Sequence, residues 1–164
     1  MYKEHIGDLF ENIKNNKPKE GIMYAQCISN DLAMGAGIAV KFNQYFNTKK
    51  QIHKQKNYFI KTKIQPNQLF SYKEDCIFSE PVFCLITKER FWHKPTLESF
   101  TNAINNFIIK VKQEQLKRPI KEIRCPLLGC GLDKLKWQDV KPILETAAEK
   151  LEENNIDMVV YKLK

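Results

Sequence analysis

The sequence lacks the long apolar segments of membrane and secreted proteins. No stretch of its 164 residues approaches the roughly 20 consecutive apolar residues that a membrane-spanning helix needs. The first twenty residues hold no apolar run typical of a secretory signal peptide. We therefore expect no membrane partner and a cytoplasmic location, or a nuclear one if the host is eukaryotic.

Patterns that bind metal ions or form disulfide frameworks are also missing. The three histidines lie far apart in the sequence, and the five cysteines are an odd number without a Cys-x-x-Cys pair. These patterns give poor support to a zinc site or a set of disulfides, so we expect no metal ion. The cysteines are interpreted as buried thiols of an intracellular protein: Cys27, Cys76, Cys84, Cys125 and Cys130.

Acidic residues are in short supply relative to basic ones. Lys and Arg together number 27 against 19 for Asp and Glu, which gives a formal net charge of +8. This excess suits an anionic partner such as a phosphate-bearing ligand, a nucleic acid or a membrane surface. The charge alone does not choose among them.

The apolar segments that are present alternate between strand-like and helix-like patterns. At 164 residues and 43% hydrophobic content, without a repeat or a linker, residues 1–164 are expected to form a single domain. Short β-branched and aromatic runs predict strands, and spacings of three and four predict helices. The predicted strands are Ile22–Ile28, Val82–Thr87, Ile123–Pro126 and Met158–Tyr161, and the predicted helices are Gly35–Phe46, Thr96–Gln115 and Trp137–Glu153.

This order predicts an α/β fold with helices on both faces of a mixed, largely parallel sheet. The more polar region 60–79 is expected to form an edge hairpin or an insertion. In such a sheet, ligands bind beyond the carboxyl ends of the strands. The residues that follow each strand are therefore the candidates for chemistry.

Two of these strand ends carry glycines. Gly35 and Gly37 precede a predicted helix whose amino end could receive a phosphate, although a structural turn explains this pattern equally well. Gly129-Cys130-Gly131 is a second candidate anion nest. Its neighbours Leu127, Leu128 and Leu132 would be unusual in a loop unless they line a pocket, and Asp133 by itself is more typical of a turn or cap.

The third strand end with unusual chemistry is that of Val82–Thr87, which Lys88 follows on the side where both glycine segments should lie. Most lysines are solvated, so only this position singles it out. If the extended geometry continues, Arg90 falls on the same face, where its charge would lower the pKa of the lysine and favour a nucleophilic amine. A bound pyrophosphate would have the opposite effect.

Together these segments resemble the macrodomain family, and within it the terminal ADP-ribose protein glycohydrolases, which are related to the DNA ADP-ribose glycohydrolase antitoxin macrodomains. The resemblance covers nearly the whole chain, in order and spacing. It departs from the subgroup at Glu89, in a stretch that the subgroup often keeps basic. The matching segments are GDLF (7–10), CISNDLAMGAGIAVKF (27–42), LITKER (85–90), HKPT (93–96), PLLGCGLDKLKW (126–137) and VYKL (160–163).

The resemblance implies a three-layer α/β/α fold that binds ADP-ribose, with Lys88 and Asp133 as the catalytic residues. It implies that Asp8, Leu9 and Leu163 contact the adenine side. Further ligand contacts are implied for the segments on both sides of the phosphates and distal ribose: Ser29, Met34, Gly35, Gly37, Ile38, Thr87, Pro126, Leu128, Gly129, Cys130, Gly131 and Leu132.

The implied activity removes ADP-ribose from Glu or Asp side chains, or from related esters such as O-acetyl-ADP-ribose, without a cofactor. The Lys88 amine would attack the anomeric carbon while Asp133 acts as general acid and base. Alternatively, a cationic Lys88 would bond the departing carboxylate while Asp133 activates water. Three other functions stay open, namely a hydrolase of ADP-ribosylated nucleic-acid bases, a non-catalytic ADP-ribose reader and a nucleic-acid-binding module. The expected partners are ADP-ribose and ADP-ribosylated proteins, and the expected state is a monomer.

Overall fold

The computed structural model describes residues 1–61 and 76–163, which contain one six-stranded sheet in the order β1-β6-β5-β2-β4-β3. All neighbouring strands are parallel except β3, which runs antiparallel to β4 at one edge. The strands are β1 (Tyr2–Ile6), β2 (Ile22–Ser29), β3 (Cys76–Ser79), β4 (Val82–Lys88), β5 (Glu122–Cys125) and β6 (Asp157–Lys162).

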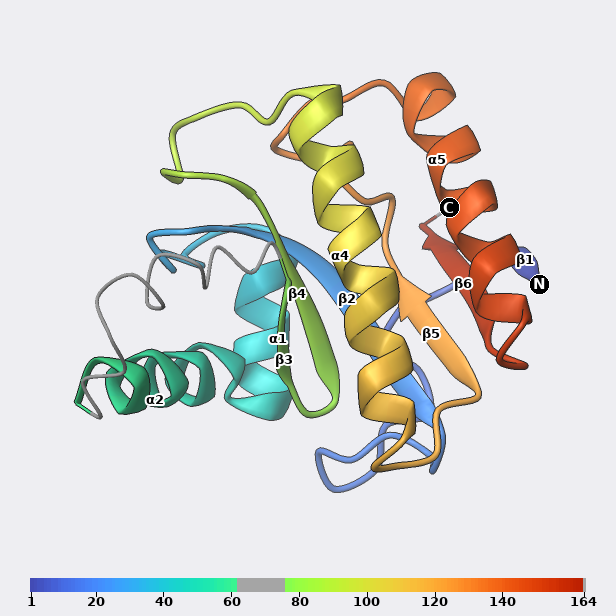
Figure 1. The fold of residues 1–164 in the computed structure, drawn as a ribbon, viewed down its shortest axis with the longest axis horizontal. Helices are drawn as coiled ribbons and strands as arrows, with labels where there is room; N and C mark the ends of the chain where they lie inside the picture. The colour runs from blue at the N-terminus through green and yellow to red at the C-terminus, as the bar shows by residue number, and fades with distance from the viewer. Residues whose placement is uncertain (62–75, 164) are drawn as a thin grey trace.

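Helices cover both faces of this sheet, which makes three layers (Figure 1). α4 (Leu97–Gln115) and α5 (Trp137–Glu152) lie side by side across one face. α1 (Ile38–Phe46) and α2 (Thr48–Lys61) lie on the other. Each face has its own apolar core, because residues of β2 and β4 alternate between the two sides. The strands in the middle are therefore apolar on both faces, as central parallel strands require.

Local sequence determines where the helices begin. Thr96 caps α4, because its hydroxyl accepts the Ser99 N–H while the Ser99 hydroxyl accepts the Thr96 N–H. α1 begins behind Gly37, which has a φ of 64°, and no side chain caps it. The amino end of α1 thus keeps backbone N–H groups free of side-chain partners.

The predicted α/β architecture and its four strands are confirmed. Strand β3 also confirms the expected edge hairpin for 76–79, whereas residues 60 and 61 of that prediction end helix α2, and residues 62–75 lie outside the described residues. The prediction missed β1 and α2. β1 is an exposed edge strand, so it lacks the apolar run by which the other strands are recognised. In the described part of the chain, no helix is long and apolar enough to cross a membrane.

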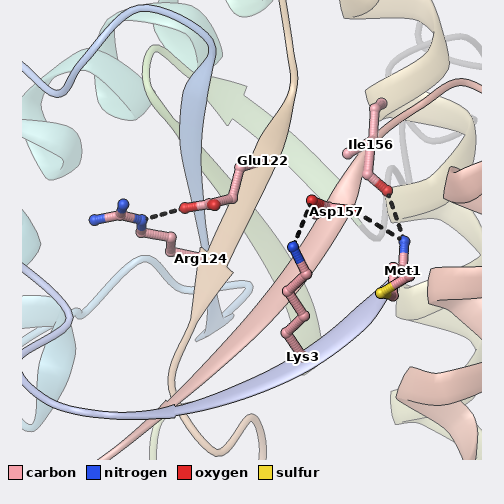
Figure 2. Close-up of polar contacts among 6 residues, drawn as sticks. All are labelled: Met1, Lys3, Glu122, Arg124, Ile156 and Asp157. Atoms are coloured by element: carbon pink, nitrogen blue, oxygen red, sulfur yellow. Dashed lines mark hydrogen bonds and ion pairs between the residues drawn. The ribbon is translucent and has the colours of Figure 1, made fainter.

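Polar contacts fasten β1 to β6, the first strand to the last. The Lys3 ammonium lies 3.0 Å from one carboxylate oxygen of Asp157, and the Met1 ammonium lies 3.2 Å from the other (Figure 2). The Met1 ammonium also donates to the Ile156 carbonyl. These contacts are exposed, so most of the attachment comes from the parallel backbone ladder.

Candidate active site

Three loops meet at the carboxyl edge of β5, β2 and β4. The loop after β2 (residues 30–37) continues the pairing with β4, since the Asn30 N–H donates to the Lys88 carbonyl at 2.8 Å and the Asp31 N–H to the Glu89 carbonyl at 3.1 Å. The loop after β4 (89–96) and the loop after β5 (126–136) complete the opening. Residues of all three loops line one cleft of about 1000 Å³. The predicted convergence of the three strand ends is confirmed.

A lysine and a carboxylate face each other in this cleft. Lys88 is the last residue of β4, and Asp133 lies 45 positions later in the loop after β5. The Lys88 Nζ lies 2.5 Å from Asp133 Oδ1, and the two side chains are only 13% and 12% exposed. Partial shielding from water strengthens such a pair and keeps a proton donor and acceptor in direct contact. The pair is therefore suited to exchange a proton while a substrate occupies the cleft.

Arg90 does not take the position that extended geometry would give it. β4 ends at Lys88, so the chain turns before the arginine is reached. The Arg90 side chain is exposed, and its charge acts on Asp31. The condition under which Arg90 would share the face of Lys88, continued extended geometry, is therefore not met.

The glycines shape the backbone on both sides of the cleft. Gly37 and Gly129 have φ angles of 64° and 73°, in the left-handed region that favours glycine, whereas Gly35 and Gly131 do not. Met34 also has a positive φ, of 46°, which is rare for a residue with a side chain. With no acidic residue in its first turn, the amino end of α1 presents N–H groups and a positive dipole end to the cleft.

Replacement of Gly129 by alanine is expected to lower the free energy of unfolding by about 1–3 kcal/mol. A Cβ there would lie 2.9 Å from Leu135 Cδ1 and 3.4 Å from the Phe100 ring, on a backbone with φ +73°. Gly131→Ala is the matched control, because a Cβ at Gly131 would meet nothing within 4 Å. Urea denaturation of both variants measures the difference, and equal losses would contradict this account of the loop.

Most of the predicted site residues line the cleft. They are Ser29, Met34, Gly35, Gly37, Ile38, Lys88, Pro126, Leu128, Gly129, Gly131, Leu132 and Asp133. The leucines of the loop after β5 also line it, with Leu127 and Leu128 buried to different degrees and Leu132 exposed. The three leucines therefore line a pocket, which is the explanation that the sequence required for apolar residues in a loop.

The other five predicted residues lie outside the cleft lining. Thr87 is buried in β4, and the Cys130 thiol lies 3.5 Å from the Leu128 carbonyl, against the core. Asp8 and Leu9 follow β1, and Leu163 follows β6, at the same edge of the sheet but beyond the cleft. The Asp8 carboxylate accepts the Phe10 N–H at 2.9 Å, Leu9 is buried, and Leu163 is exposed.

The structure adds cleft residues that sequence reasoning missed, including Cys27, Phe91, Lys94 and Lys134. One signal was available for Phe91. Two consecutive aromatic residues, Phe91 and Trp92, stand in an otherwise polar loop directly after a strand. Two large aromatic side chains in a polar loop are expected to be exposed, and exposed aromatic side chains indicate a binding surface.

Comparison with known proteins identifies the family. No family model matches the sequence. The human protein named ADP-ribose glycohydrolase OARD1 is 32% identical over 157 residues, which cover 96% of this chain and 88% of that protein. The solved macrodomain of Thermus aquaticus DarG superposes with a TM-score of 0.66 at 19% identity, covering 99% of this chain and 98% of that one. The chain belongs to the macrodomain family.

A further solved structure, Thermosipho africanus DarTG in complex with ADP-ribose, matches 99% of the macrodomain and 42% of that chain. Its TM-score is 0.62 at 18% identity, so this likeness concerns the fold. The three-layer α/β/α fold implied by the sequence motifs is thus confirmed by solved macrodomains.

Two cysteines border the cleft of the macrodomain. Cys76, Cys84 and Cys125 are buried as expected, whereas Cys27 and Cys130 are partly exposed, which corrects the interpretation of all five as buried. Burial raises the pKa of the Cys27 thiol, and the charge of Asp133 raises it further. A thiol held protonated is a weak nucleophile, so Cys27 is poorly suited to attack a ligand in the cleft. Among the described residues, no three His, Cys, Asp or Glu side chains are grouped as metal ligands would be.

Asp31 links the loop after β2 to the loop after β4 through hydrogen bonds. Its Oδ1 accepts the Ser29 hydroxyl at 2.5 Å and the Ala33 N–H at 3.1 Å, while its Oδ2 accepts the Phe91 N–H at 2.9 Å. Burial alone would raise the pKa of this carboxyl. The hydrogen bonds from Ser29, Phe91 and Ala33 and the Arg90 charge outweigh burial and lower the pKa below its usual value.

The Asp31 pKa gives a prediction of pH dependence. Because the folded-state pKa is below the value of about 3.9 for an unfolded chain, the carboxylate stabilises the fold above that pH and loses this effect as the pH falls through the folded-state pKa. We expect Asp31→Asn to lower the free energy of unfolding by about 1 kcal/mol at pH 7, allowing for partial exposure. The difference should shrink below about pH 4. Denaturant titrations from pH 3 to pH 8 measure it, with Glu149→Gln on α5 as control. A difference that grows on acidification would contradict the assignment.

Proposed function

We propose that this macrodomain hydrolyses the bond between ADP-ribose and a carboxylate acceptor. The acceptor is a Glu or Asp side chain of a mono-ADP-ribosylated protein, or the acyl group of an ester such as O-acetyl-ADP-ribose. The observation that carries this proposal is the Lys88–Asp133 pair, because it places an amine and a carboxylate 2.5 Å apart in the cleft. The similarity to a protein named ADP-ribose glycohydrolase supports it.

The cleft offers the groups that an ADP-ribose molecule needs. Its pyrophosphate would lie at the amino end of α1 and along the loops of Gly37 and Gly129, where backbone N–H groups favour anions. The distal ribose would then reach Lys88 and Asp133. The adenine would extend along the same sheet edge toward Asp8 and Leu163, which follow the neighbouring strands β1 and β6.

The reaction proceeds in two steps at the anomeric carbon of the distal ribose. Asp133 Oδ1 accepts a proton from the Lys88 ammonium, and the freed nitrogen lone pair attacks the carbon. The carbon–nitrogen bond forms as the carbon–oxygen bond breaks, and its electrons leave with the acceptor carboxylate. Water then adds to the anomeric carbon as the carbon–nitrogen bond breaks, and Asp133 gives its proton back to the departing lysine nitrogen. The added water loses a proton to solvent, and Lys88 is again an ammonium as ADP-ribose is released.

In the competing route Lys88 stays cationic and bonds the departing carboxylate while Asp133 activates water. A cation fits poorly beside a transition state with oxocarbenium character, because both carry positive charge. The direct contact with a carboxylate favours the covalent route, since it gives the ammonium proton an acceptor.

A substrate panel tests the proposal. The wild-type macrodomain is incubated with ADP-ribose linked to protein Glu, to protein Ser, to single-stranded DNA, and to acetate, and free ADP-ribose is counted. We expect release from the Glu and acetyl esters, because a carboxylate is a good leaving group. Release from DNA alone would replace the proposal with a nucleic-acid hydrolase, for which the net charge of +8 is the supporting observation. Binding without release from any substrate would make the protein an ADP-ribose reader.

A further inference from the structure

Two aromatic side chains stand exposed beside the cleft. Phe91 and Trp92 are 61% and 63% exposed, and their ring centroids lie 5.1 Å apart at an angle of 89°. The Trp92 ring also meets His93 edge to face, with centroids 5.5 Å apart. Leu132, from the opposite loop, is 62% exposed. Large apolar side chains gathered at the surface of one site are typical of a contact with a partner.

This surface is held in place by hydrogen bonds. The Phe91 N–H donates to Asp31, and the His93 N–H donates to the Arg90 carbonyl at 3.0 Å, which closes a turn around the aromatic pair. The Lys94 ammonium donates to the Leu132 carbonyl at 2.7 Å and so joins the two loops. The loop after β4 is thus fixed between its two neighbours, which reduces the entropy lost when a partner binds.

The surface is continuous with the cleft. Phe91 and Leu132 line the cleft together with Lys88 and Asp133, and each lies one to three positions from a member of that pair. A substrate whose anomeric carbon meets Lys88 directs its acceptor away from the ADP-ribose walls. Outside the cleft, such an acceptor would meet the exposed side chains of Phe91 and Leu132, which line the cleft, and that of Trp92, whose ring contacts Phe91.

We propose that Phe91, Trp92 and Leu132 dock the polypeptide around the ADP-ribosylated carboxylate and select acceptors that carry a large apolar side chain next to the modified residue. This inference rests on the proposed function. The charges around the surface support a polypeptide. Arg90 and Lys134 are exposed at its rim and suit an acidic acceptor segment.

A nucleic acid fits this surface less well. Glu89 lies in the loop that carries the aromatic pair, and Asp31, in the loop after β2, accepts a hydrogen bond from the Phe91 backbone. A chain with a phosphate at every nucleotide would place negative charge against both carboxylates, whereas a peptide can set its few carboxylates near Arg90 and Lys134 and present a neutral backbone to Asp31 and Glu89. The aliphatic Leu132 also matches an apolar side chain better than a stacked base.

Two ADP-ribosylated peptides test the proposal. They share one Glu-linked ADP-ribose and differ only at the next residue, which is Leu in one and Gly in the other. We expect the wild type to favour the Leu peptide about 10-fold in kcat/KM, mainly through KM, because burial of one large apolar side chain gives a discrimination of this order. Trp92→Ala should bring the ratio near one. Since the readout is a ratio, a general loss of activity cancels. Leu116→Ala, at a side chain 90% exposed at the end of α4, should keep the wild-type ratio.

A binding measurement separates this proposal from the proposed function. The chain has two tryptophans, so Trp137→Phe leaves Trp92 as the only one, and Lys88→Ala prevents consumption of the peptide. In this double variant, the Leu peptide should change Trp92 fluorescence and bind about 10-fold more tightly than the Gly peptide. That result supports docking even if the wild type releases no ADP-ribose, which would overturn only the proposed function. Equal binding of the peptides, or a fluorescence change with single-stranded DNA alone, overturns the docking proposal.

Discussion

Replacement of Lys88 by alanine is expected to reduce the release of ADP-ribose from acyl-linked substrates by at least about 10³-fold. The variant lacks the attacking nitrogen, and Asp133 loses the ammonium 2.5 Å away with which it exchanges a proton. ADP-ribose itself should still bind within about 10-fold of wild type, because backbone N–H groups make the phosphate contacts of the proposed site. Release assays and calorimetric binding of ADP-ribose measure the two effects separately.

Lys134→Ala is the matched control for this experiment. Lys134 also lines the cleft and adjoins Asp133, but its side chain is exposed and belongs to the rim. The Lys134→Ala variant should retain most activity toward O-acetyl-ADP-ribose. This result would show that loss of a positive charge from the cleft does not by itself abolish the release of ADP-ribose. Full turnover by Lys88→Ala, with ADP-ribose still bound, would rule out the lysine as nucleophile.

Asp133→Asn is expected to slow turnover by about 10²–10⁴-fold, the usual effect of removing a general acid and base. An amide accepts no proton from Lys88, so both formation and breakdown of the lysyl adduct slow down. The nitrogen of the adduct forms a C=N bond as the bond from the anomeric carbon to the ring oxygen breaks and that oxygen becomes a hydroxyl. Borohydride reduces this imine to a stable amine. Mass spectrometry after borohydride treatment with substrate should therefore show a heavier chain for wild type and none for Lys88→Ala.

The two substitutions also discriminate between the two mechanisms. If Lys88 only bonds the departing carboxylate, wild type turns over substrate and no covalent mass is trapped. Equal residual activity of Lys88→Ala and Asp133→Asn, close to that of wild type, would remove both residues from the reaction. The free energy of unfolding of each variant shows whether a loss of activity reflects a loss of structure.

The sequence predicts those site residues that directly follow the parallel strands. Once Ile22–Ile28, Val82–Thr87 and Ile123–Pro126 are recognised as strands, their carboxyl ends must share one edge of the sheet, and the glycine loops and Lys88 follow. The bounds of α4 were also predicted closely, because the apolar spacing of three and four that predicts a helix over Thr96–Gln115 belongs to the observed helix Leu97–Gln115. Apolar periodicity and short polar motifs involve residues close together in the chain, so they can be recognised in the sequence without knowledge of the tertiary structure.

The remaining features depend on contacts between distant residues. The 2.5 Å contact between Lys88 and Asp133 joins positions 45 apart, and nothing near Asp133 distinguishes it from a turn aspartate. The end of β4 at Lys88 could not be predicted either, so the position of Arg90 stayed conditional on whether the strand continued. Strand β1 escaped prediction because its exposed side chains depend on a partner strand more than 150 residues later.

The pairing of β1 with β6 also determines when β1 can join the sheet as the chain is synthesised. Within the described sheet β1 pairs with β6 alone, and β6 ends at Lys162. Because β1 is synthesised more than 150 residues before β6, it can join the sheet only after β6 has been made, and the loop that carries Asp8 waits with it. An interrupted chain could form β2, β4 and β5 with their helices and still lack the adenine end of the proposed site. Completion of the proposed binding site is thereby coupled to the synthesis of β6.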